Sequence, residues 1–334
     1  MLIYGNSGLQ QFKAVNPAQI SPQCPSKLYL DITEDCNMHC IMCRNKIKNS
    51  GEIMDITLYK RVIDETCWGV TSYSLFSWGE PLLVKDFKDR LLYLSKRKLP
   101  QALLDISTNG MLLTKDYSKF LLDNDVEVTI SFDGATSETF EGIRKGSEFK
   151  IISKNLEYLA KISEQNNPIR VPGIYISIQK NNLNELNQIF KYVYNLGVKR
   201  IGMGLVIHPN KYRAEVSDQL IEMLNTSIMY ANEKKIFIDL LPTKIGKYIW
   251  NGINYSENNN YYIDKTCDAP FNTASIGWNG NIYLCCNYGD YVDNINNKKF
   301  LDIWNSDLYN EFRKRVNNEN MPDRCIDCPW VNRN

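Results

Sequence analysis

The main structural signal of the chain is the stretch Lys27-Leu-Tyr-Leu-Asp-Ile-Thr33, which is followed by Glu34, Asp35 and Cys36-Asn-Met-His-Cys40-Ile-Met-Cys43. Leu28, Leu30 and Ile32 alternate with other residues, which predicts a β-strand. Three cysteines with the spacing C-x3-C-x2-C follow that strand directly. In α/β folds, functional groups collect on the loops after the carboxyl ends of the strands. The sequence therefore predicts a functional loop after the first strand.

Short strands and amphipathic helices alternate from here to about residue 234. We predict strands at 27–33, 72–79, 102–108, 126–134, 173–179 and 199–207. We predict helices at 55–66, 86–98, 114–124, 136–163, 184–197 and 219–234. Six strands that are each followed by a helix imply parallel pairing through right-handed crossovers. This length is too short for a full eight-unit barrel, and both an open partial barrel and a doubly wound sheet fit the pattern.

The α/β region is expected to be one of four segments. Residues 1–26 read as an N-terminal extension, 27–240 as the α/β domain, 241–266 as a polar, Asn-rich linker and 267–334 as a small module. Within the module, Asn279-Gly280 between two apolar runs predicts a β-hairpin over 273–286. Residues 299–316 are predicted to form one amphipathic helix.

Composition and charge limit the function. The chain has 334 residues, and 39 Lys+Arg nearly balance 38 Asp+Glu, so no general attraction to nucleic acid or to an anionic membrane is expected. The sequence contains no apolar run long enough for a membrane span and begins with no signal-peptide pattern, which predicts a soluble, cytoplasmic protein. Ten cysteines against two histidines, clustered near both ends of this sequence, indicate metal or redox chemistry.

The first cysteine cluster suits an iron–sulfur centre. Thiolates of Cys36, Cys40 and Cys43 on one tight loop can hold three irons of a 4Fe–4S cubane and leave the fourth iron without a protein ligand. Such an open position is typical of catalytic metal sites. The alternative is a zinc site that uses His39. His39 is adjacent to Cys40, however, and two neighbouring residues are poorly placed to coordinate the same ion.

The second cluster supplies four more thiolates. Cys267 is followed by x12-Gly280-x4-Cys285, and then come Cys325 and Cys328 with two residues between them. Four thiolates are a complete ligand set for one 4Fe–4S cluster, and a structural zinc site is the alternative.

The C-x3-C-x2-C loop after the first strand resembles that of the radical S-adenosylmethionine (SAM) superfamily. Ser77-Trp78-Gly79-Glu80-Pro81, at the end of the second predicted strand, is similar to the Gly-Gly-Glu-Pro motif of that family. The resemblance implies that Gly79 and Glu80 bind the amino group of SAM. We therefore expect Glu80 to act through SAM binding and to contribute little to stability.

Further residues extend the resemblance. Ser131-Phe132-Asp133-Gly134, which ends the fourth predicted strand, is similar to the ribose-contacting segment, and this implies SAM contacts by Ser131 and Asp133. Arg144 matches an arginine that approaches the SAM carboxylate, and Met42 stands where an aromatic residue often lies against adenine. The implied fold is a partial (β/α)6 TIM-like barrel.

The C-terminal cysteines resemble the opening of the SPASM motif in its shortened "twitch" form. This implies a module of a β-hairpin and a helix that holds a second, auxiliary 4Fe–4S cluster. The resemblance also implies reductive cleavage of SAM to a 5′-deoxyadenosyl radical, which takes a hydrogen atom from the substrate, and a reductase or flavodoxin-type protein as electron donor.

The outline is similar to 2-deoxy-scyllo-inosamine dehydrogenase-like members, which implies oxidation of a sugar- or cyclitol-like metabolite. The alternatives are a sugar epimerase with Cys286 or Cys67 as hydrogen donor, a maturase of a ribosomal peptide, and a non-enzymatic iron–sulfur or zinc protein. The sequence does not identify the substrate or the catalytic base.

Overall fold

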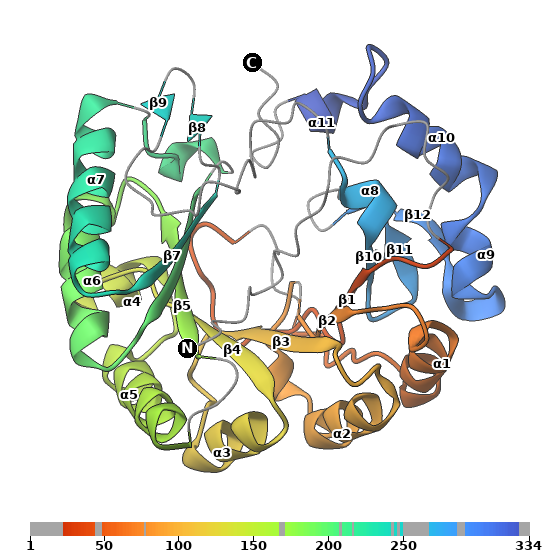
Figure 1. The fold of residues 1–334 in the computed structure, drawn as a ribbon, viewed down its shortest axis with the longest axis horizontal. Helices are drawn as coiled ribbons and strands as arrows, with labels where there is room; N and C mark the ends of the chain where they lie inside the picture. The colour runs from red at the N-terminus through yellow and green to blue at the C-terminus, as the bar shows by residue number, and fades with distance from the viewer. Residues whose placement is uncertain are drawn as a thin grey trace.

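The fold is an open, curved sheet with its helices on the convex side, as the ribbon of the computed structural model shows (Figure 1). The structure describes residues 23–43, 49–76, 78–166, 171–206, 209–215, 217–241, 244–245, 248–249, 267–285 and 291–326. The helices are α1 (Ile56–Thr66), α2 (Phe87–Arg97), α3 (Lys115–Asp123), α4 (Ser137–Ile143), α5 (Phe149–Asn166), α6 (Leu186–Asn195), α7 (Asp218–Glu233), α8 (Ala269–Asn272), α9 (Phe300–Trp304), α10 (Asp307–Arg315) and α11 (Asp323–Ile326). The strands are β1 (Lys27–Leu30), β2 (Ser72–Ser74), β3 (Leu103–Thr108), β4 (Val126–Ser131), β5 (Gly173–Ile178), β6 (Arg200–Leu205), β7 (Phe237–Leu241), β8 (Lys244–Ile245), β9 (Tyr248–Ile249), β10 (Thr273–Ile276), β11 (Asn281–Tyr283) and β12 (Tyr291–Asn294).

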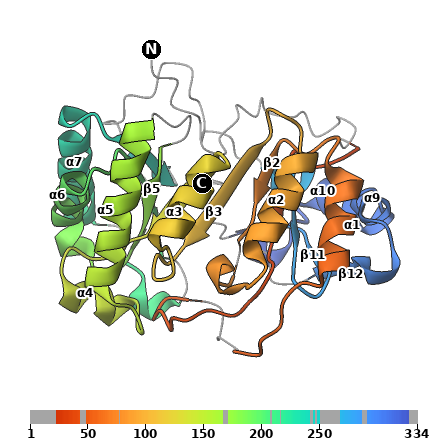
Figure 2. The same cartoon turned by 90° about the horizontal axis from the view of Figure 1, so that it is seen from below.

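Strand order distinguishes the two folds that the sequence allowed. In the main sheet β1 to β7 pair in sequence order, and every neighbouring pair is parallel. A doubly wound sheet reverses its order at a switch point and has helices on both faces. Here the crossovers all advance in one direction and α1 to α7 cover only the outer face (Figures 1 and 2). The structure is therefore the partial TIM-like barrel, with β7 as a strand that the sequence reading missed.

Local signals set most of the helix ends. Asp55 caps α1 because its side chain accepts hydrogen bonds from Thr57 N and Leu58 N at 2.8 and 3.2 Å. Gly197, directly after the C-cap of α6, has a φ of +91°, which a glycine adopts without strain. The predicted helix at 136–163 is two helices, α4 and α5, because Gly146 between them has a φ of +86°.

The C-terminal module is built onto the barrel sheet. β10 pairs in parallel with β1, and β10, β11 and β12 form an antiparallel meander, so one ten-stranded sheet runs through both parts. The predicted hairpin is confirmed, with Gly280 at a φ of +84°. The predicted single helix at 299–316 is wrong: Ser306 accepts a hydrogen bond from Tyr309 N at 3.3 Å and starts α10 as a new helix after α9.

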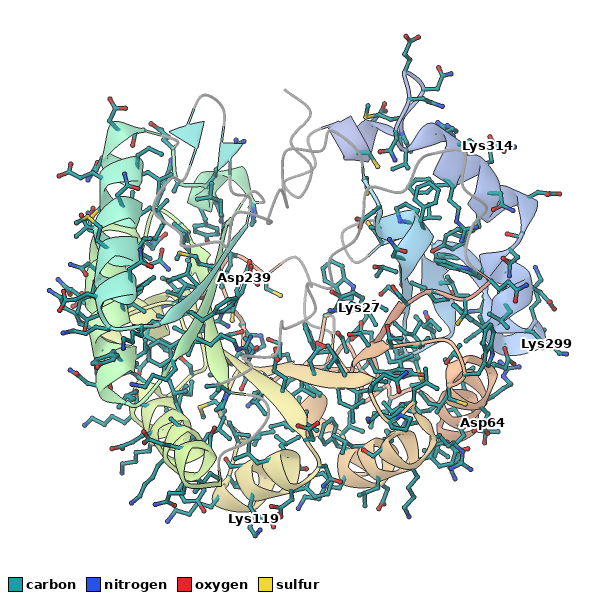
Figure 3. All side chains as sticks on the ribbon, in the orientation of Figure 1. Lys27, Asp64, Lys119, Asp239, Lys299 and Lys314 are labelled. Atoms are coloured by element: carbon teal, nitrogen blue, oxygen red, sulfur yellow. The ribbon has the colours of Figure 1, made fainter. Side chains whose placement is uncertain are left out.

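The two faces of the barrel strands differ in character. Leu28, Leu30, Leu104, Ile106, Ile130, Ile174, Ile176, Ile201 and Met203 are buried under the helices. The alternate residues face the concave side, which we call the inner face, and most of them are polar. Figure 3 shows Lys27 and Asp239 on this inner face, whereas Asp64, Lys119, Lys299 and Lys314 lie at the outer surface. None of the described helices has the length and apolar character that a bilayer-spanning segment needs.

Candidate active site

The loop that carries the first three cysteines, residues 34–43, is clamped by segments that follow other strands. Glu80 N donates to Asp35 O at 2.8 Å from the segment after β2. His39 N donates to Lys145 O at 2.7 Å and Ile41 N donates to Ile143 O at 2.9 Å, and both acceptors belong to the end of α4 and the loop after it. These backbone contacts fix the loop over the carboxyl ends of the strands.

Two glycines allow these segments to approach the cysteine loop. A Cβ atom at Gly79 would lie 2.1 Å from Thr33 O and 2.8 Å from Asp35 O, so only glycine fits this position. Gly146 is favoured by its positive φ, since a Cβ there would be in ordinary contact with Asn37 O at 3.4 Å. Glycine at 79, which the family resemblance singled out, therefore has a steric reason in this chain.

The thiols of this loop are free and each of the first two has a side-chain donor nearby. Asn109 Nδ2 donates to Cys36 Sγ at 3.7 Å, and Arg144 Nη1 donates to Cys40 Sγ at 3.8 Å. Cys43 is exposed. Burial raises the pKa of Cys36 to about 11 and also raises the pKa of Cys40, so these groups are thiols at neutral pH until a metal ion displaces the proton.

The cysteine loop carries the groups that a 4Fe–4S cluster needs. Cys36, Cys40 and Cys43 are free thiols on one loop, and N–H donors lie beside Cys36 and Cys40. His39 lies on the same loop and is exposed. Thiolates that accept hydrogen bonds are what a cubane cluster requires of its protein ligands.

Glu80 lies at the centre of the site but is 2 % exposed. Its Oε1 accepts from Thr108 Oγ1 at 2.7 Å and from Leu82 N at 3.2 Å, and its Oε2 accepts from Asn109 N at 2.7 Å. Burial raises the pKa of Glu80 to about 7 despite these bonds. We therefore revise the expectation that Glu80 contributes little to stability, since the carboxyl joins the segments after β2 and β3. Its contact with SAM stays a prediction.

Asp133 and Arg144 form a buried ion pair, with 2.7 Å between Arg144 Nη2 and Asp133 Oδ2. Asp133 Oδ1 accepts from Ser177 N at 2.7 Å, which fixes the carboxylate against β5. Arg144 Nε is buried and has no hydrogen-bond partner among the described residues. Ser131 and Met42 are half-buried at the same end of the barrel. The structure thus brings these four predicted residues to one region, and their SAM contacts stay predictions.

Three of the four predicted auxiliary ligands lie in the described part of the module. Cys267 precedes α8 and is joined to the segment after α10, because its N–H donates to Asn317 Oδ1 at 2.6 Å and Asn317 Nδ2 donates back to Cys267 O at 2.9 Å. Cys285 follows β11 and interacts electrostatically with Tyr309 of α10. Cys325 lies in α11. Cys328 falls outside the described residues, so the fourth ligand stays a prediction.

Of the two candidate hydrogen donors, Cys67 lies in the described part of the chain and Cys286 does not. Cys67 caps the carboxyl end of α1, and its thiol faces Asp64 O at 3.8 Å. Because α1 runs antiparallel to the strands on the outer face, its end lies at the amino edge of the sheet, away from the cysteine loop. We therefore withdraw Cys67 as a hydrogen donor. Cys286 lies outside the described residues, as does Ser77 of the Gly79-Glu80 motif.

The sequence reading missed two residues that the structure places at the site. Asn109 contacts Cys36, Asn37 and Glu80 at once. Asp31, 2 % exposed at the end of β1, accepts from Trp78 N at 3.1 Å, and burial raises its pKa to about 7. Each follows its strand directly, so the position of polar residues at strand ends was a signal that could have found them.

Comparison with known proteins agrees with this geometry. A family model described as the radical SAM superfamily matches residues 30–193, and a model described as an iron–sulfur cluster-binding domain, SPASM, matches residues 267–329. The chain therefore contains a radical SAM domain followed by a C-terminal SPASM domain. The radical SAM match includes the cysteine loop, Glu80, Asp133 and Arg144, and the SPASM match includes all the auxiliary cysteines.

Two relatives match this chain over most of its length. It is 27% identical over 90% of the chain to the tungsten-containing aldehyde ferredoxin oxidoreductase cofactor-modifying protein of Pyrococcus furiosus, of which it covers 86%. It is 25% identical over 92% of the chain to the AdoMet-dependent heme synthase of Methanosarcina barkeri, of which it covers 89%.

A solved structure shares the fold. The crystal structure of Streptococcus suis SuiB bound to S-adenosylmethionine is similar with a TM-score of 0.66 and 18% identity, covering 92% of this chain and 72% of that one. The fold prediction is thereby confirmed, and so are the predicted cofactors: SAM, its 4Fe–4S cluster and an auxiliary iron–sulfur centre in the SPASM domain.

Proposed function

We propose that this radical SAM enzyme oxidises a C–H bond of a small, polar metabolite, most simply a secondary alcohol of a sugar or cyclitol, held against the inner face of the barrel. The observation that carries the proposal is the polar character of that face. The substrate and the direction of the reaction are part of the proposal, whereas the radical SAM chemistry belongs to the family.

The inner face carries charged and hydroxyl side chains on neighbouring strands. Strand register places Tyr29, Ser74, Asp105 and Glu127 side by side on β1 to β4. Ser74 Oγ donates to the Asp105 carboxylate. A substrate with several hydroxyl groups can exchange hydrogen bonds with such a wall, which an apolar substrate cannot do.

Two glycines of β6 also face this wall. Gly202 lies beside Tyr175 of β5 and Asp239 of β7, and Gly204 lies beside Ser177. Asp239 Oδ1 is buried and has no hydrogen-bond partner among the described residues. At the amino end, Arg200 closes the wall through its ion pair with Glu127, 3.1 Å between Nη1 and Oε1. This supports a substrate that enters from the carboxyl end, where the cysteine loop lies.

The residues at the carboxyl end fit the SAM cofactor. Buried Arg144 Nε is a donor without an acceptor, which suits a carboxylate, and Glu80 lies in the clamped segment beside the cysteine loop. When bound, the cluster and SAM supply a carbon-centred radical that removes a hydrogen atom from the substrate. We assign Cys36, Cys40 and Cys43 to the cluster, and Gly79, Glu80, Ser131, Asp133, Arg144 and Met42 to SAM.

Oxidation requires that the substrate lose a second electron and a proton. The SPASM domain is continuous with the wall, since β10 pairs with β1, and this supports the auxiliary centre as the electron acceptor. We assign Cys267, Cys285, Cys325 and Cys328 as its ligands. Asp31, Asp105 and Asp239 are the inner-face carboxyl groups available for the proton. An external reductase or flavodoxin-type protein would supply the electron for SAM cleavage.

Epimerisation is less well supported. It requires a thiol that returns a hydrogen atom, and of the described cysteines outside the two proposed ligand sets, Cys24 is buried and Cys67 lies at the opposite edge. The names of the relatives, a cofactor-modifying protein and a heme synthase, favour modification of a cofactor-sized molecule as the second candidate function. Peptide maturation remains a third outcome of the test.

The test begins with anaerobically reconstituted protein, SAM and dithionite. Release of 5′-deoxyadenosine is expected, and its absence would favour a non-enzymatic iron–sulfur protein. Panels of sugars and aminocyclitols, of tetrapyrroles and of short peptides then show which class accelerates that release. The proposal expects a product two mass units lighter from the first panel. In deuterated water, stable deuterium at an inverted carbon would replace oxidation by epimerisation.

A further inference from the structure

We propose that Asn109 and Arg144 are positioning residues of the SAM-binding cluster: they direct N–H groups at Cys36 and Cys40 and thereby raise the reduction potential of the cluster. The family chemistry does not require these two contacts, and they do not depend on which substrate the enzyme takes. The inference does rest on the proposed ligands Cys36, Cys40 and Cys43.

The orientation of Asn109 is fixed by its neighbours. Its Oδ1 accepts from Met111 N at 3.0 Å, which assigns the nitrogen end of the carboxamide to the other side. There Nδ2 donates to Asn37 Oδ1 at 2.7 Å and to Cys36 Sγ at 3.7 Å. Asn109 is 6 % exposed, and its backbone N–H is bound to Glu80. The donor is therefore held toward the sulfur in a site largely closed to water.

Arg144 is held by a different set of contacts. Its Nη2 pairs with Asp133 at 2.7 Å, and its backbone N–H donates to Phe140 O at 2.8 Å at the end of α4. Phe132, next to Asp133, packs on Phe140 with ring centroids 4.9 Å apart. This packing fixes both ends of the segment, so that Nη1 reaches Cys40 Sγ at 3.8 Å.

The expected effect follows from electrostatics. Reduction adds one negative charge to the cluster and its thiolates. Hydrogen bonds to the sulfurs and nearby positive charge stabilise that charge, and a poorly solvated environment strengthens the effect. Asn109 contributes a neutral donor, and Arg144 contributes a donor and a charge. Asp133, 0 % exposed beside Arg144, opposes part of that charge.

These roles predict opposite signs for neighbouring substitutions. Asn109→Leu and Arg144→Met remove a donor and should shift the midpoint potential to more negative values. Asp133→Asn removes a negative charge next to Arg144 and should shift it to more positive values. A merely structural role would not produce this reversal between Arg144→Met and Asp133→Asn, because both substitutions break the same buried ion pair.

The measurement is an EPR-monitored redox titration of reconstituted full-length protein without SAM, so that effects on SAM binding do not enter. The relevant signal is the one that changes when SAM is added afterwards. Arg90→Met is the matched control, because Arg90 is buried and paired with Asp86 far from the cysteine loop on the outer face. Asn124→Leu, at the end of α3, is the control for Asn109.

Conservative variants keep the test valid if a substitution prevents folding. Arg144→Lys keeps the charge and loses the forked geometry, so its shift should be smaller than that of Arg144→Met. Asn109→Ser gives the same negative direction with less change in volume. Unchanged potentials in the Asn109 and Arg144 variants, or a negative shift in Asp133→Asn, would overturn the proposal. If the Cys36→Ala, Cys40→Ala, Cys43→Ala triple variant keeps the SAM-responsive signal, the ligand assignment itself has failed.

Discussion

At the scale of single residues, two buried carboxyl groups connect the backbone segments of the site. Glu80 and Asp31 are each 2 % exposed, and burial raises both pKa values to about 7. Each also holds a backbone segment: Glu80 accepts from Asn109 N, and Asp31 accepts from Trp78 N. A family motif identifies the position of Glu80 in the chain, but it does not reveal that the side chain also joins two strand ends.

Glu80→Gln is expected to lower stability as well as SAM affinity. The amide nitrogen of glutamine cannot accept, so one of the donors Thr108 Oγ1, Leu82 N or Asn109 N loses its partner. We expect a loss of about 1–3 kcal/mol in the free energy of unfolding. Differential scanning calorimetry of the reconstituted protein checks this, with Glu164→Gln as the control because Glu164 is exposed. An unchanged melting temperature would mean that these bonds are dispensable.

Asp31→Asn should change how stability depends on pH. The pKa of Asp31 is about 7 in the folded protein and 3.8 for an aspartate fully exposed to water, so between those limits the folded state holds a proton that the unfolded state has released. Stability from this group is therefore full below about pH 4, falls as pH rises to about 7, and is then constant.

The shift of roughly three units corresponds to a loss of at most about 4 kcal/mol over that range. Asp31→Asn removes this term, so the melting temperature of the variant relative to wild type should rise from pH 4 to pH 7. Asp89→Asn on the exposed side of α2 is the control. If the difference in melting temperature between Asp31→Asn and wild type stays constant from pH 4 to pH 7, the raised pKa of Asp31 is wrong.

At the scale of elements, the sequence pattern predicted strand and helix types better than their ends and breaks. All six expected strands are present, and the Asn279-Gly280 turn forms as predicted. The break between α9 and α10 was missed because the apolar periodicity continues through Asn305 and Ser306. The capping bond of Ser306 outweighs that periodicity, and only the structure shows it.

The candidate site, too, could be predicted from the sequence only in part. Spacing identified the cysteines, and the resemblance identified Glu80, Asp133 and Arg144. Asn109 was not found because its function depends on three contacts from segments far apart in the sequence, Cys36, Asn37 and Glu80. Parallel pairing of β1, β2 and β3 brings these segments together, and a single strand's pattern carries no information about which loops will meet.

Gly79→Ala tests whether close approach of the segments builds the site. The added Cβ would lie 2.1 Å from Thr33 O, so the segment after β2 must move away from the cysteine loop. We expect reduced iron content and loss of SAM cleavage. Gly142→Ala in α4 is the matched control, because its Cβ would meet nothing within 4 Å, and it should stabilise the protein by about 1 kcal/mol. Iron retention by Gly79→Ala equal to that of Gly142→Ala would contradict this account.

At the scale of the whole molecule, barrel and module share a sheet but hold their cysteines by separate contacts. The contacts described above for the first cysteine loop come from Asn109, Ile143, Arg144, Lys145 and the segment around Glu80, all within the barrel. The module has its own core, in which the Arg313 guanidinium packs against both Trp304 and Tyr309, 4.3 Å from each ring, and donates to Pro270 O at 2.9 Å.

This separation predicts that each metal centre survives loss of the other. A variant with alanine at Cys267, Cys285 and Cys325 should keep about four of about eight irons and still release 5′-deoxyadenosine with dithionite, because the barrel clamps are intact. It should no longer complete an oxidation, because the second electron has no acceptor. The variant with alanine at Cys36, Cys40 and Cys43 should also keep about four irons but release no 5′-deoxyadenosine. Iron analysis, EPR and product assays separate these cases, with Cys24→Ala as the control thiol; loss of all iron from either variant would show that the shared sheet couples the two centres.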